Sequence, residues 1–348
     1  MKAAIIGGRG AGKSTVFHAL TGLAPLEGQS DAKSRARFGQ IKIPDPRLDF
    51  LESTYGSKKK VQVELTLMDF APNPKEQKAG AALDPSLLPM IREPDALLIV
   101  IPAFGAAAVD LIPAVESVEA ELVFADFEQG ERRLERLKKE KGANDFERVA
   151  LEKCLRHLEQ GAPLRKLELS EQETQVLATF CFLSQKPALV VINCDTEQAA
   201  AATDAKLHSA MSTRGLDVLK LAAAFEAELW ELEPEAQREL LSEAGLKAPA
   251  RDRLIATLYG HLGLMTFYTA GEPEAHAWSL RRGASALEAA ARIHSDIARG
   301  FIRAEVVSYE DFAALRSDAK VKEAGKLRLE GKDYLMRDGD IIHIRFKV

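Results

Sequence analysis

The residues best suited to chemistry stand in the stretch GGRGAGKST near the N-terminus. Its spacing fits the phosphate-binding pattern G-x-x-x-x-G-K-[ST], which begins at Gly7 and closes with Gly12, Lys13 and Ser14. Glycines let the backbone turn tightly, so that successive N–H groups point inward, and the following helix adds a partial positive charge at its N-terminus. The pattern predicts a loop that binds nucleotide phosphates. Its predicted binding residues are Gly7, Gly8, Arg9, Gly10, Ala11, Gly12, Lys13, Ser14 and Thr15.

Within this loop, two side chains have specific predicted roles. Lys13 would contact the β- and γ-phosphates as the phosphate-stabilising residue, and the Ser14 hydroxyl would bind Mg²⁺. The flanking segments fit as well, because AAIIG is typical of a strand and STVFHALTG has the apolar spacing of a helix with one buried face. A glycine-rich turn without a ligand is the minor alternative. Whether a bound nucleotide is also hydrolysed stays open at this point.

Two polar residues follow apolar runs elsewhere in the chain. VQVELTLMDF ends near Asp69, PALVVIN ends at Asn193, and DALLIVIPAF between them is a continuous apolar run suited to a buried parallel strand. Strands that alternate with helices behind a phosphate loop predict a doubly wound α/β sheet, whose ligands lie beyond the carboxyl ends of the strands. Asp69 is therefore predicted to hold Mg²⁺ together with Ser14, with an ordinary turn aspartate as the alternative.

Length and composition limit the kind of protein. The 348 residues and 46% hydrophobic content are sufficient for two or three domains with their own cores. A net charge of −5 gives no general attraction for nucleic acid or membranes, so no membrane or DNA partner is predicted and RNA would need a local patch.

The cysteines and the hydropathy pattern indicate a compartment. Cys154, Cys181 and Cys194 are odd in number, widely spaced and without a C-x-x-C pair, which argues against disulfides and a zinc site. No apolar run approaches about 18 residues, and no N-terminal targeting signal is visible. We therefore expect a cytoplasmic location.

Residues 114–165 are rich in Glu, Lys, Arg and Leu and predict a helical hairpin inserted in the sheet domain. The charges of RRLERLKKEK predict a solvated face, with a surface for a partner or nucleic acid as the alternative. The stretch GAND predicts a break between the helices. The predicted apolar face consists of Val115, Val118, Leu122, Leu134, Leu137, Phe146, Val149, Leu151, Leu155 and Leu158.

From about residue 265 the pattern changes to short strands and turns. LMTFYTAG, EAHAWSL, FIRAEVVSY, KDYLM and IIHIRFKV predict a small, separate β-rich domain. The predicted organisation is a phosphate-loop domain of residues 1–113 and 166–264, a helical hairpin of residues 114–165, and a β-rich domain of residues 265–348.

Several longer passages carry a family resemblance. They are PDPRLDFL, MIREPDALL, ADFEQGERRLERLKK, ELSEQETQVL with KPALVVIN, and the C-terminal AWSLRRGASALEAAARIHSDIARGFIRAEVVSYEDF and KEAGKLRLEGKDYLMRDGDIIHIRFKV. Through them the chain resembles the YchF family, also called Obg-like ATPases, over nearly its whole length. The resemblance implies a P-loop NTPase fold with an inserted helical domain and a C-terminal β-grasp, ubiquitin-like TGS domain.

The same resemblance implies a function. Members of this family bind ATP, and sometimes GTP, with Mg²⁺, hydrolyse it slowly, and associate with ribosomes or other cellular partners. A ribosome or RNA partner would then bind through the TGS and helical domains. We expect a monomer.

The chain departs from the family pattern around the expected γ-phosphate position. Asp69 begins the family's D-x-x-G motif, but Pro72 replaces the glycine and has no N–H to offer. Lys33 stands near the expected magnesium-binding threonine, where Ser30 or Ser34 could substitute. Arg9 and Gly10 replace a Pro-Asn pair, and the arginine could stabilise phosphoryl charge or point into solvent.

The loop that follows DALLIVIP also differs, because it contains no histidine where the family carries one implicated in hydrolysis. Asp110 is the only ionisable residue between Phe104 and Pro113, and helix capping or exposure is its expected role. No residue is therefore predicted as a general base.

Base recognition is altered too. The family has Asn-x-x-Glu where guanine-specific proteins have Asn-Lys-x-Asp, and here INCDTEQ puts Thr196 at the fourth position and Glu197 one residue later. Strict guanine selection is not expected. Phe104 stands where an aromatic residue lies near the base, with an ordinary core role as the alternative. The predicted contacts to the base are Phe104, Asn193, Cys194, Ala222, Ala223 and Ala224.

Two hypotheses follow from these departures. The first is a slow ATP hydrolase, with GTP as a second substrate. The second is a nucleotide-binding scaffold without hydrolysis that docks a ribosome, RNA or a protein partner through its helical and TGS domains.

Overall fold

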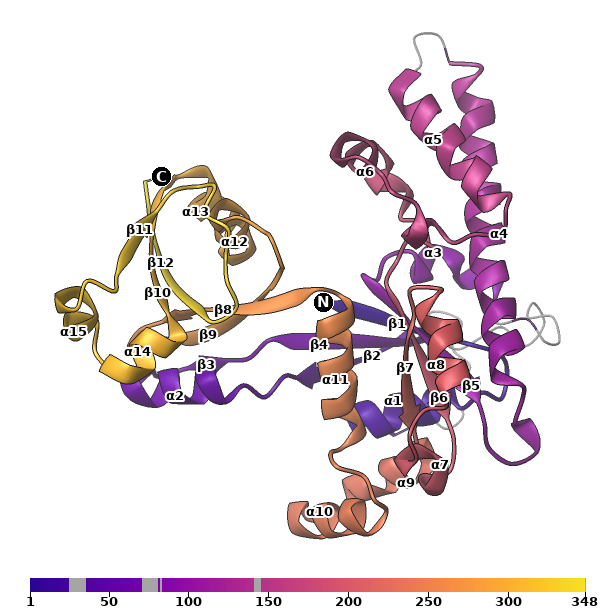
Figure 1. The fold of residues 1–348 in the computed structure, drawn as a ribbon, viewed down its shortest axis with the longest axis horizontal. Helices are drawn as coiled ribbons and strands as arrows, with labels where there is room; N and C mark the ends of the chain where they lie inside the picture. The colour runs from indigo at the N-terminus through magenta and orange to yellow at the C-terminus, as the bar shows by residue number, and fades with distance from the viewer. Residues whose placement is uncertain (25–35, 71–80, 82, 141–144, 348) are drawn as a thin grey trace. The chain divides into compact units, whose positions relative to one another are not determined.

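The computed structural model describes residues 1–24, 36–70, 81, 83–140 and 145–347 (Figure 1). Their packing divides the chain into two compact units. Unit 1 consists of residues 1–41 and 65–257, and unit 2 of residues 42–64 and 258–348. Within the described ranges, no helix is long and apolar enough to cross a membrane.

Unit 1 is built on a six-stranded sheet in the order β2-β4-β1-β5-β6-β7. The strands from β4 to β7 in this order all pair in parallel, with Ile5 opposite Asp69 and Pro102 opposite Asn193. The bounds are β1 (Lys2–Ile6), β2 (Ala36–Lys42), β4 (Glu64–Phe70), β5 (Ala96–Pro102), β6 (Ala188–Asn193) and β7 (Asp217–Leu221).

This sheet confirms the predicted α/β class. Every residue of β6 and the first six of β5 are buried, as expected of continuous apolar runs in a parallel sheet covered on both faces. The helices of unit 1 are α1 (Lys13–Thr21), α3 (Leu88–Ile91), α4 (Leu111–Leu137), α5 (Asp145–Leu158), α6 (Glu171–Leu177), α7 (Thr196–Ala200), α8 (Ala205–Ser212), α9 (Ala223–Glu228) and α10 (Pro234–Glu243), and α11 (Ala250–His261) crosses into unit 2.

Helices α4 and α5 run side by side as the predicted hairpin (Figure 1). They have their own hydrophobic cluster, in which Leu137, Leu151 and Leu155 pack with residues of α6 and with Phe180 and Phe182. Gly130 of α4 permits this close approach, because a Cβ there would lie 2.8 Å from a methyl carbon of Leu155.

The predicted apolar face of the hairpin is only partly buried. Phe146 and Val149 are 43% and 51% exposed, so the prediction that they face inward was wrong. Both lie in the first turns of α5, next to the connection between the helices and outside the hydrophobic cluster. Leu134 is half-buried. The remaining predicted positions, Val115, Val118, Leu122, Leu137, Leu151, Leu155 and Leu158, are buried.

Unit 2 contains a second sheet in the order β11-β10-β12-β8-β9-β3. Helix α12 covers part of it with Ala286, Ala289 and Ala290, which pack with apolar residues of β8, β9, β10 and β12. The bounds are β3 (Lys60–Val61), β8 (Leu264–Ala270), β9 (Ala275–Arg281), β10 (Phe301–Ser308), β11 (Arg328–Glu330) and β12 (Asp340–Phe346), with α2 (Pro46–Tyr55), α12 (Ala286–Ile293), α13 (Ser295–Arg299), α14 (Tyr309–Leu315) and α15 (Asp318–Glu323).

One predicted strand of this unit is wrong. KDYLM forms no strand, and Leu335 makes an isolated β-bridge with Ser285, the N-cap residue of α12. The backbone turns instead, since the Tyr334 N–H donates to the Gly331 carbonyl at 3.3 Å and the Met336 N–H to the Ala284 carbonyl at 3.0 Å. The strand lies just before it, as β11.

Residues 42–64 pack in unit 2, whereas the sequence prediction grouped them with the phosphate-loop domain. Asp45 caps α2 by accepting from the Arg47 N–H at 2.9 Å, and it also accepts from the buried Tyr268 hydroxyl of β8. The Arg47 guanidinium donates to Asp338 at 2.7 Å. These polar contacts between distant parts of the sequence explain the assignment; the boundaries of the three domains stay a prediction.

Candidate functional site

The stretch GGRGAGKST forms a loop between β1 and α1 that has glycine at three positions with positive φ, two of which are also closely packed. Gly12 has φ 84°, and a Cβ there would lie 2.2 Å from the amide nitrogen of Asn193. Gly7 has φ 145°, and its Cβ would lie 2.4 Å from the carbonyl oxygen of Val100 in β5. The loop therefore passes directly over the ends of β5 and β6, with α1 beginning at Lys13.

Lys13 folds back over this loop. Its ammonium group donates to the carbonyl oxygens of Gly7 at 2.9 Å and Gly8 at 2.8 Å. Burial lowers the pKa of Lys13, and the nearby charge of Asp69 partly opposes that shift. The cation is thus held beside the loop by carbonyl dipoles that a phosphate group could replace.

Ser14 and Asp69, the two predicted Mg²⁺ ligands, lie together. The Ser14 hydroxyl donates to Asp69 Oδ2 at 3.0 Å. Asp69 is 4% exposed, and its Oδ1 atom is buried without a hydrogen-bond partner among the residues that the structure describes. A buried carboxylate oxygen without a partner is costly, so this oxygen fits a cation or a cation-bound water.

A third residue, Arg37, shares this carboxylate. Its guanidinium lies 3.2 Å from Asp69 Oδ2, donates to the Ala24 carbonyl at 3.0 Å, and stands 4.5 Å from the centre of the Phe17 ring. Sequence reasoning missed Arg37. It belongs to no motif, and the only available signal was a basic residue at the start of a strand that follows the rim loop.

Asn193 and Phe104, two of the predicted base contacts, lie next to the loop. The Asn193 amide donates to the Ala11 carbonyl at 3.1 Å, so it supports the loop backbone directly. One ring carbon of Phe104 lies 3.7 Å from the point where a Gly12 Cβ would stand. Their contacts to a base stay predictions.

The other predicted base contacts lie at the neighbouring ends of β6 and β7. The Cys194 N–H donates to the Leu221 carbonyl at 2.9 Å, and burial raises the pKa of the Cys194 thiol. Ala222 and Ala223 are buried at the start of α9, whereas Ala224 is exposed. Any contact of Cys194 with a nucleotide would involve the backbone more readily than this buried side chain.

The remaining predicted residues have simpler positions. Arg9 is exposed, which fits the solvent-directed alternative, and Thr15 is half-buried. Asp110 is the N-cap residue of α4 without a side-chain capping bond. Thr196 and Glu197 occupy the first turn of α7, whose N-cap Asp195 accepts from the Gln198 N–H at 2.8 Å. Ser30, Lys33, Ser34 and Pro72 lie outside the described residues.

The positions of Ser14 and Asp69 fit a metal ion that is also bound by oxygens of a phosphate ligand. Within the described part of the chain, no group of three His, Cys, Asp or Glu side chains could hold a metal ion by itself. Mg²⁺ is commonly held by one or two protein oxygens together with substrate phosphates and water, which is the donor set that Ser14 and Asp69 would complete.

Comparisons with known proteins identify the relatives of this chain. A family model described as YchF-GTPase_C, a protein of unknown function (DUF933), matches residues 264–347. The chain is 36% identical to the ribosome-binding ATPase YchF of Bacillus subtilis, with 100% of both chains covered. It is 35% identical to the protein of the same name from Haemophilus influenzae, with 100% and 99% covered.

A solved structure gives the same result at the level of the fold. The Schizosaccharomyces pombe YchF GTPase is similar with a TM-score of 0.82 and 28% sequence identity, over 99% of this chain and 97% of that chain. Full-length similarity in sequence and in structure, together with a phosphate loop in the same chain, leads to one conclusion: the chain belongs to the YchF family.

Proposed function

We propose that the chain binds ATP, and GTP as a second nucleotide, together with Mg²⁺ at the phosphate loop, and hydrolyses the bound nucleotide slowly. The observation that carries this proposal is the pairing of Ser14 with Asp69 at 3.0 Å, next to the loop on which Lys13 lies. The names of the bacterial relatives, which describe ATPases, support the choice of ATP.

In this proposal each residue has a separate task. The loop N–H groups and the N-terminus of α1 bind phosphate oxygens, and Lys13 exchanges the Gly7 and Gly8 carbonyls for the β- and γ-phosphates. Ser14 and Asp69 hold the metal. When bound, Mg²⁺ neutralises charge on the phosphate oxygens.

The base is selected only weakly in this proposal. INCDTEQ has no lysine after Asn193 and no acidic residue at the fourth position. The Asn193 amide group already donates to the Ala11 carbonyl at 3.1 Å, which ties it to the phosphate loop. Strong discrimination between bases needs polar groups in the site that form hydrogen bonds with one base and are left unpaired by the other. We therefore expect only a modest preference between ATP and GTP.

The second candidate, binding without hydrolysis, also has an observation in its favour. Residues 103–110 contain no histidine, and their one ionisable residue, Asp110, is an exposed helix N-cap residue. That loop therefore supplies no evident group to position a water molecule. Slow turnover would then depend on positioning and charge neutralisation alone.

Single-turnover hydrolysis distinguishes the two candidates. We expect the wild-type protein to release phosphate from ATP more slowly than about 1 per second, and the Lys13→Ala variant to release at least about tenfold less. Nucleotide binding without release above the Lys13→Ala level would favour the scaffold. If neither ATP nor GTP binds, both candidates are wrong.

The proposed macromolecular partner is the ribosome, because the bacterial relatives are named ribosome-binding ATPases. The helical hairpin and the TGS domain are the proposed contact regions, and a monomer and a cytoplasmic location stay predictions. Co-sedimentation with ribosomes across a salt series tests this, because phosphate-backbone contacts weaken steeply as salt rises. Failure to co-sediment in any nucleotide state at low salt would contradict the ribosome proposal and leave the nucleotide proposal standing.

A further inference from the structure

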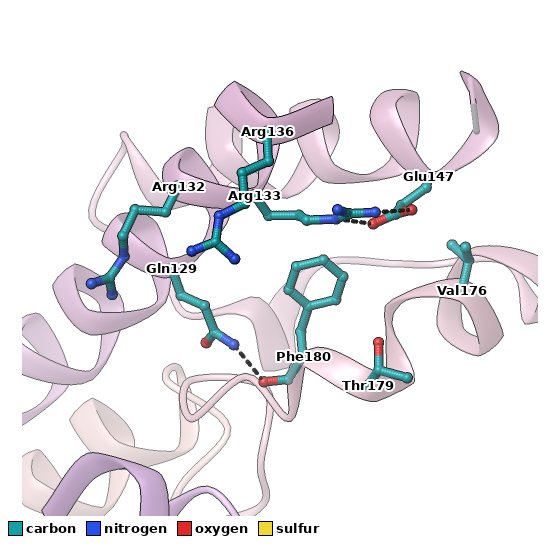
Figure 2. A pocket seen from close by; sticks show the side chains of 8 residues that line it. All are labelled: Gln129, Arg132, Arg133, Arg136, Glu147, Val176, Thr179 and Phe180. Carbon is teal, nitrogen blue, oxygen red and sulfur yellow. Dashed lines mark hydrogen bonds and ion pairs between the residues drawn. The ribbon is translucent and has the colours of Figure 1, made fainter. Parts of the chain in front are cut away.

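A cavity of about 540 Å³ lies on the helical hairpin, and none of the residues that line it belongs to the phosphate loop (Figure 2). One face of α4 forms one wall, because residues three and four positions apart project from the same side of a helix. The segment that follows α6 forms the opposite side. The lining residues are Gln129, Arg132, Arg133, Arg136, Glu147, Val176, Thr179 and Phe180.

Among the described residues, carboxylates form ion pairs with one of the three arginines in this cavity. Arg133 donates to both oxygens of Glu147, at 2.8 and 3.0 Å, and to Glu140 at 2.8 Å (Figure 2). The Arg132 Nε donates to the backbone carbonyl of Glu128 at 3.1 Å. Neither Arg132 nor Arg136 forms an ion pair with any described residue.

Arg132 and Arg136 are exposed, and two like charges four positions apart on one helix repel each other weakly. Arg132 and Arg136 have this spacing and both line the cavity. Guanidinium groups present several N–H donors in a plane and bind phosphate oxygens in pairs. An anion with several oxygens would therefore relieve this repulsion and could bind both side chains.

Gln129 adds a second, independent indication of a ligand. Its amide nitrogen donates to the Phe180 carbonyl at 3.0 Å, whereas its amide oxygen is buried and has no hydrogen-bond partner among the described residues (Figure 2). A buried acceptor in this position needs a donor, such as a hydroxyl or an amino group. An inorganic anion that only accepts hydrogen bonds would leave it unsatisfied.

The remaining wall is apolar. The Phe180 ring is stacked on Phe182 with 5.0 Å between the ring centres, which fixes its orientation, and the Val176 side chain lies on the same side of the cavity. A volume of about 540 Å³ falls within the range of small-molecule sites. The cavity thus combines a cationic wall, one buried acceptor and an apolar surface.

We propose that this cavity binds a small phosphate monoester that carries a hydroxyl group, of the class of sugar phosphates and nucleoside monophosphates. The phosphate lies on Arg132 and Arg136, and the hydroxyl donates to Gln129. A phosphate at the end of an RNA strand offers similar chemistry. The concave shape and the single buried acceptor favour the free small molecule. This inference does not depend on the nucleotide proposal.

The test uses the full-length Lys13→Ala variant, so that the phosphate loop does not compete for the ligand. Ribose 5-phosphate, AMP and UMP are titrated calorimetrically without Mg²⁺ at low salt, with ribose as the probe that lacks phosphate. We expect one site for the monoesters and none for ribose. Adding Arg132→Gln and Arg136→Gln should weaken binding at least about tenfold, and Gln129→Leu about threefold or more.

The matched control is Lys138→Gln with Arg156→Gln, which removes the same charge from residues lining a different pocket of the hairpin. This control should bind the monoesters like its parent. An equal loss in the control would show general charge attraction and overturn the proposal. So would absence of binding by all three monoesters, or an Arg132- and Arg136-dependent preference for a short oligoribonucleotide over the monoesters. Circular dichroism shows whether each variant is folded.

Discussion

At the scale of single residues, Gly12 is a position where the loop backbone tolerates little change. Its φ of 84° is unfavourable for any other residue, and an added Cβ would lie 2.2 Å from the Asn193 amide nitrogen. We predict that Gly12→Ala lowers ATP affinity at least about tenfold and destabilises the protein by about 1–3 kcal/mol. Calorimetric titration and thermal unfolding measure the two effects.

Gly8 offers the matched control in the same loop. A Cβ on Gly8 would meet nothing within 4 Å, and its backbone is not in the left-handed region. Gly8→Ala should therefore keep ATP affinity within about threefold of the wild type. Equal losses in both variants would contradict the view that the Gly12 geometry is the specific requirement.

Arg37 shares the carboxylate of Asp69 with the proposed metal site. Its guanidinium lies 3.2 Å from the carboxylate oxygen that also accepts from Ser14. Since removal of this positive charge makes the carboxylate more attractive to a cation, we predict that Arg37→Gln increases Mg²⁺ affinity about threefold to tenfold. Titration of Mg²⁺ against protein with bound fluorescent ATP analogue measures it.

Lys42 is the control for this effect, because it is an exposed cation at the end of the same strand, β2. Lys42→Gln should leave Mg²⁺ affinity unchanged. Weaker Mg²⁺ binding in Arg37→Gln would mean that the arginine supports the metal site and does not compete with it.

These residues also show how far sequence reasoning reaches. Lys13 and Ser14 were predicted because the motif is local, and Asp69 and Asn193 because the carboxyl ends of parallel strands meet at one sheet edge. Arg37 could not be predicted, since its contact with Asp69 joins residues 32 positions apart without a recognisable pattern.

At the scale of elements, the helical hairpin has a hydrophobic interior that contains one of the three cysteines. Cys154 of α5 is buried in the hairpin cluster, and burial raises the pKa of its thiol to about 11. Cys194 is buried as well, whereas Cys181 is exposed. We predict that iodoacetamide at pH 8 modifies Cys181 and leaves Cys154 and Cys194 unmodified in the native protein.

The sign of the pH effect follows from the raised pKa. The reactive form is the thiolate, and a thiol that ionises near pH 11 contains very little thiolate at pH 8. Mass spectrometry of the alkylated protein counts modified sites, and alkylation in urea is the control in which all three cysteines react. Rapid labelling of Cys154 at pH 8 without denaturant would contradict the packed hairpin.

Strands with a clear hydropathy pattern were predicted from the sequence, and strands with a weak pattern were not. β5 and β6 are short, continuous apolar runs, and this pattern is typical of fully buried strands. β7 was missed because DVLKL is short and carries two charged residues. KDYLM has strand-like residues but forms turns, since its backbone N–H groups bond to Gly331 and Ala284.

At the scale of the whole molecule, the association of residues 42–64 with unit 2 depends on buried polar contacts. The fully buried Tyr268 donates its hydroxyl to Asp45, which also caps α2. Tyr268→Phe would remove one donor from the half-buried Asp45 carboxylate, which keeps its bonds from Arg47, so we predict a loss of about 1–3 kcal/mol in the stability of unit 2. Tyr309→Phe is the control. The Tyr309 ring makes an edge contact with Phe50, and phenylalanine keeps this ring while it removes the hydroxyl.

The chain has two tryptophans, one in each unit, which makes this measurement specific. Urea unfolding followed by Trp278 fluorescence in a Trp230→Phe background reports on unit 2. An unchanged midpoint in Tyr268→Phe would contradict the role of this contact. The grouping itself could not be predicted from the sequence, because Asp45 and Tyr268 are 223 positions apart and neither stands in a pattern that points to the other.

The claim that connects all three scales is that Ser14 and Asp69 complete a magnesium–nucleotide site on the phosphate loop. The most direct test is the affinity for ATP with Mg²⁺ and with EDTA, measured by equilibrium titration for the wild type and for Asp69→Asn. We predict that Mg²⁺ strengthens binding to the wild type at least about tenfold and changes binding to Asp69→Asn less than about threefold. The same Mg²⁺ dependence in both proteins, or no ATP binding by the wild type, would contradict it.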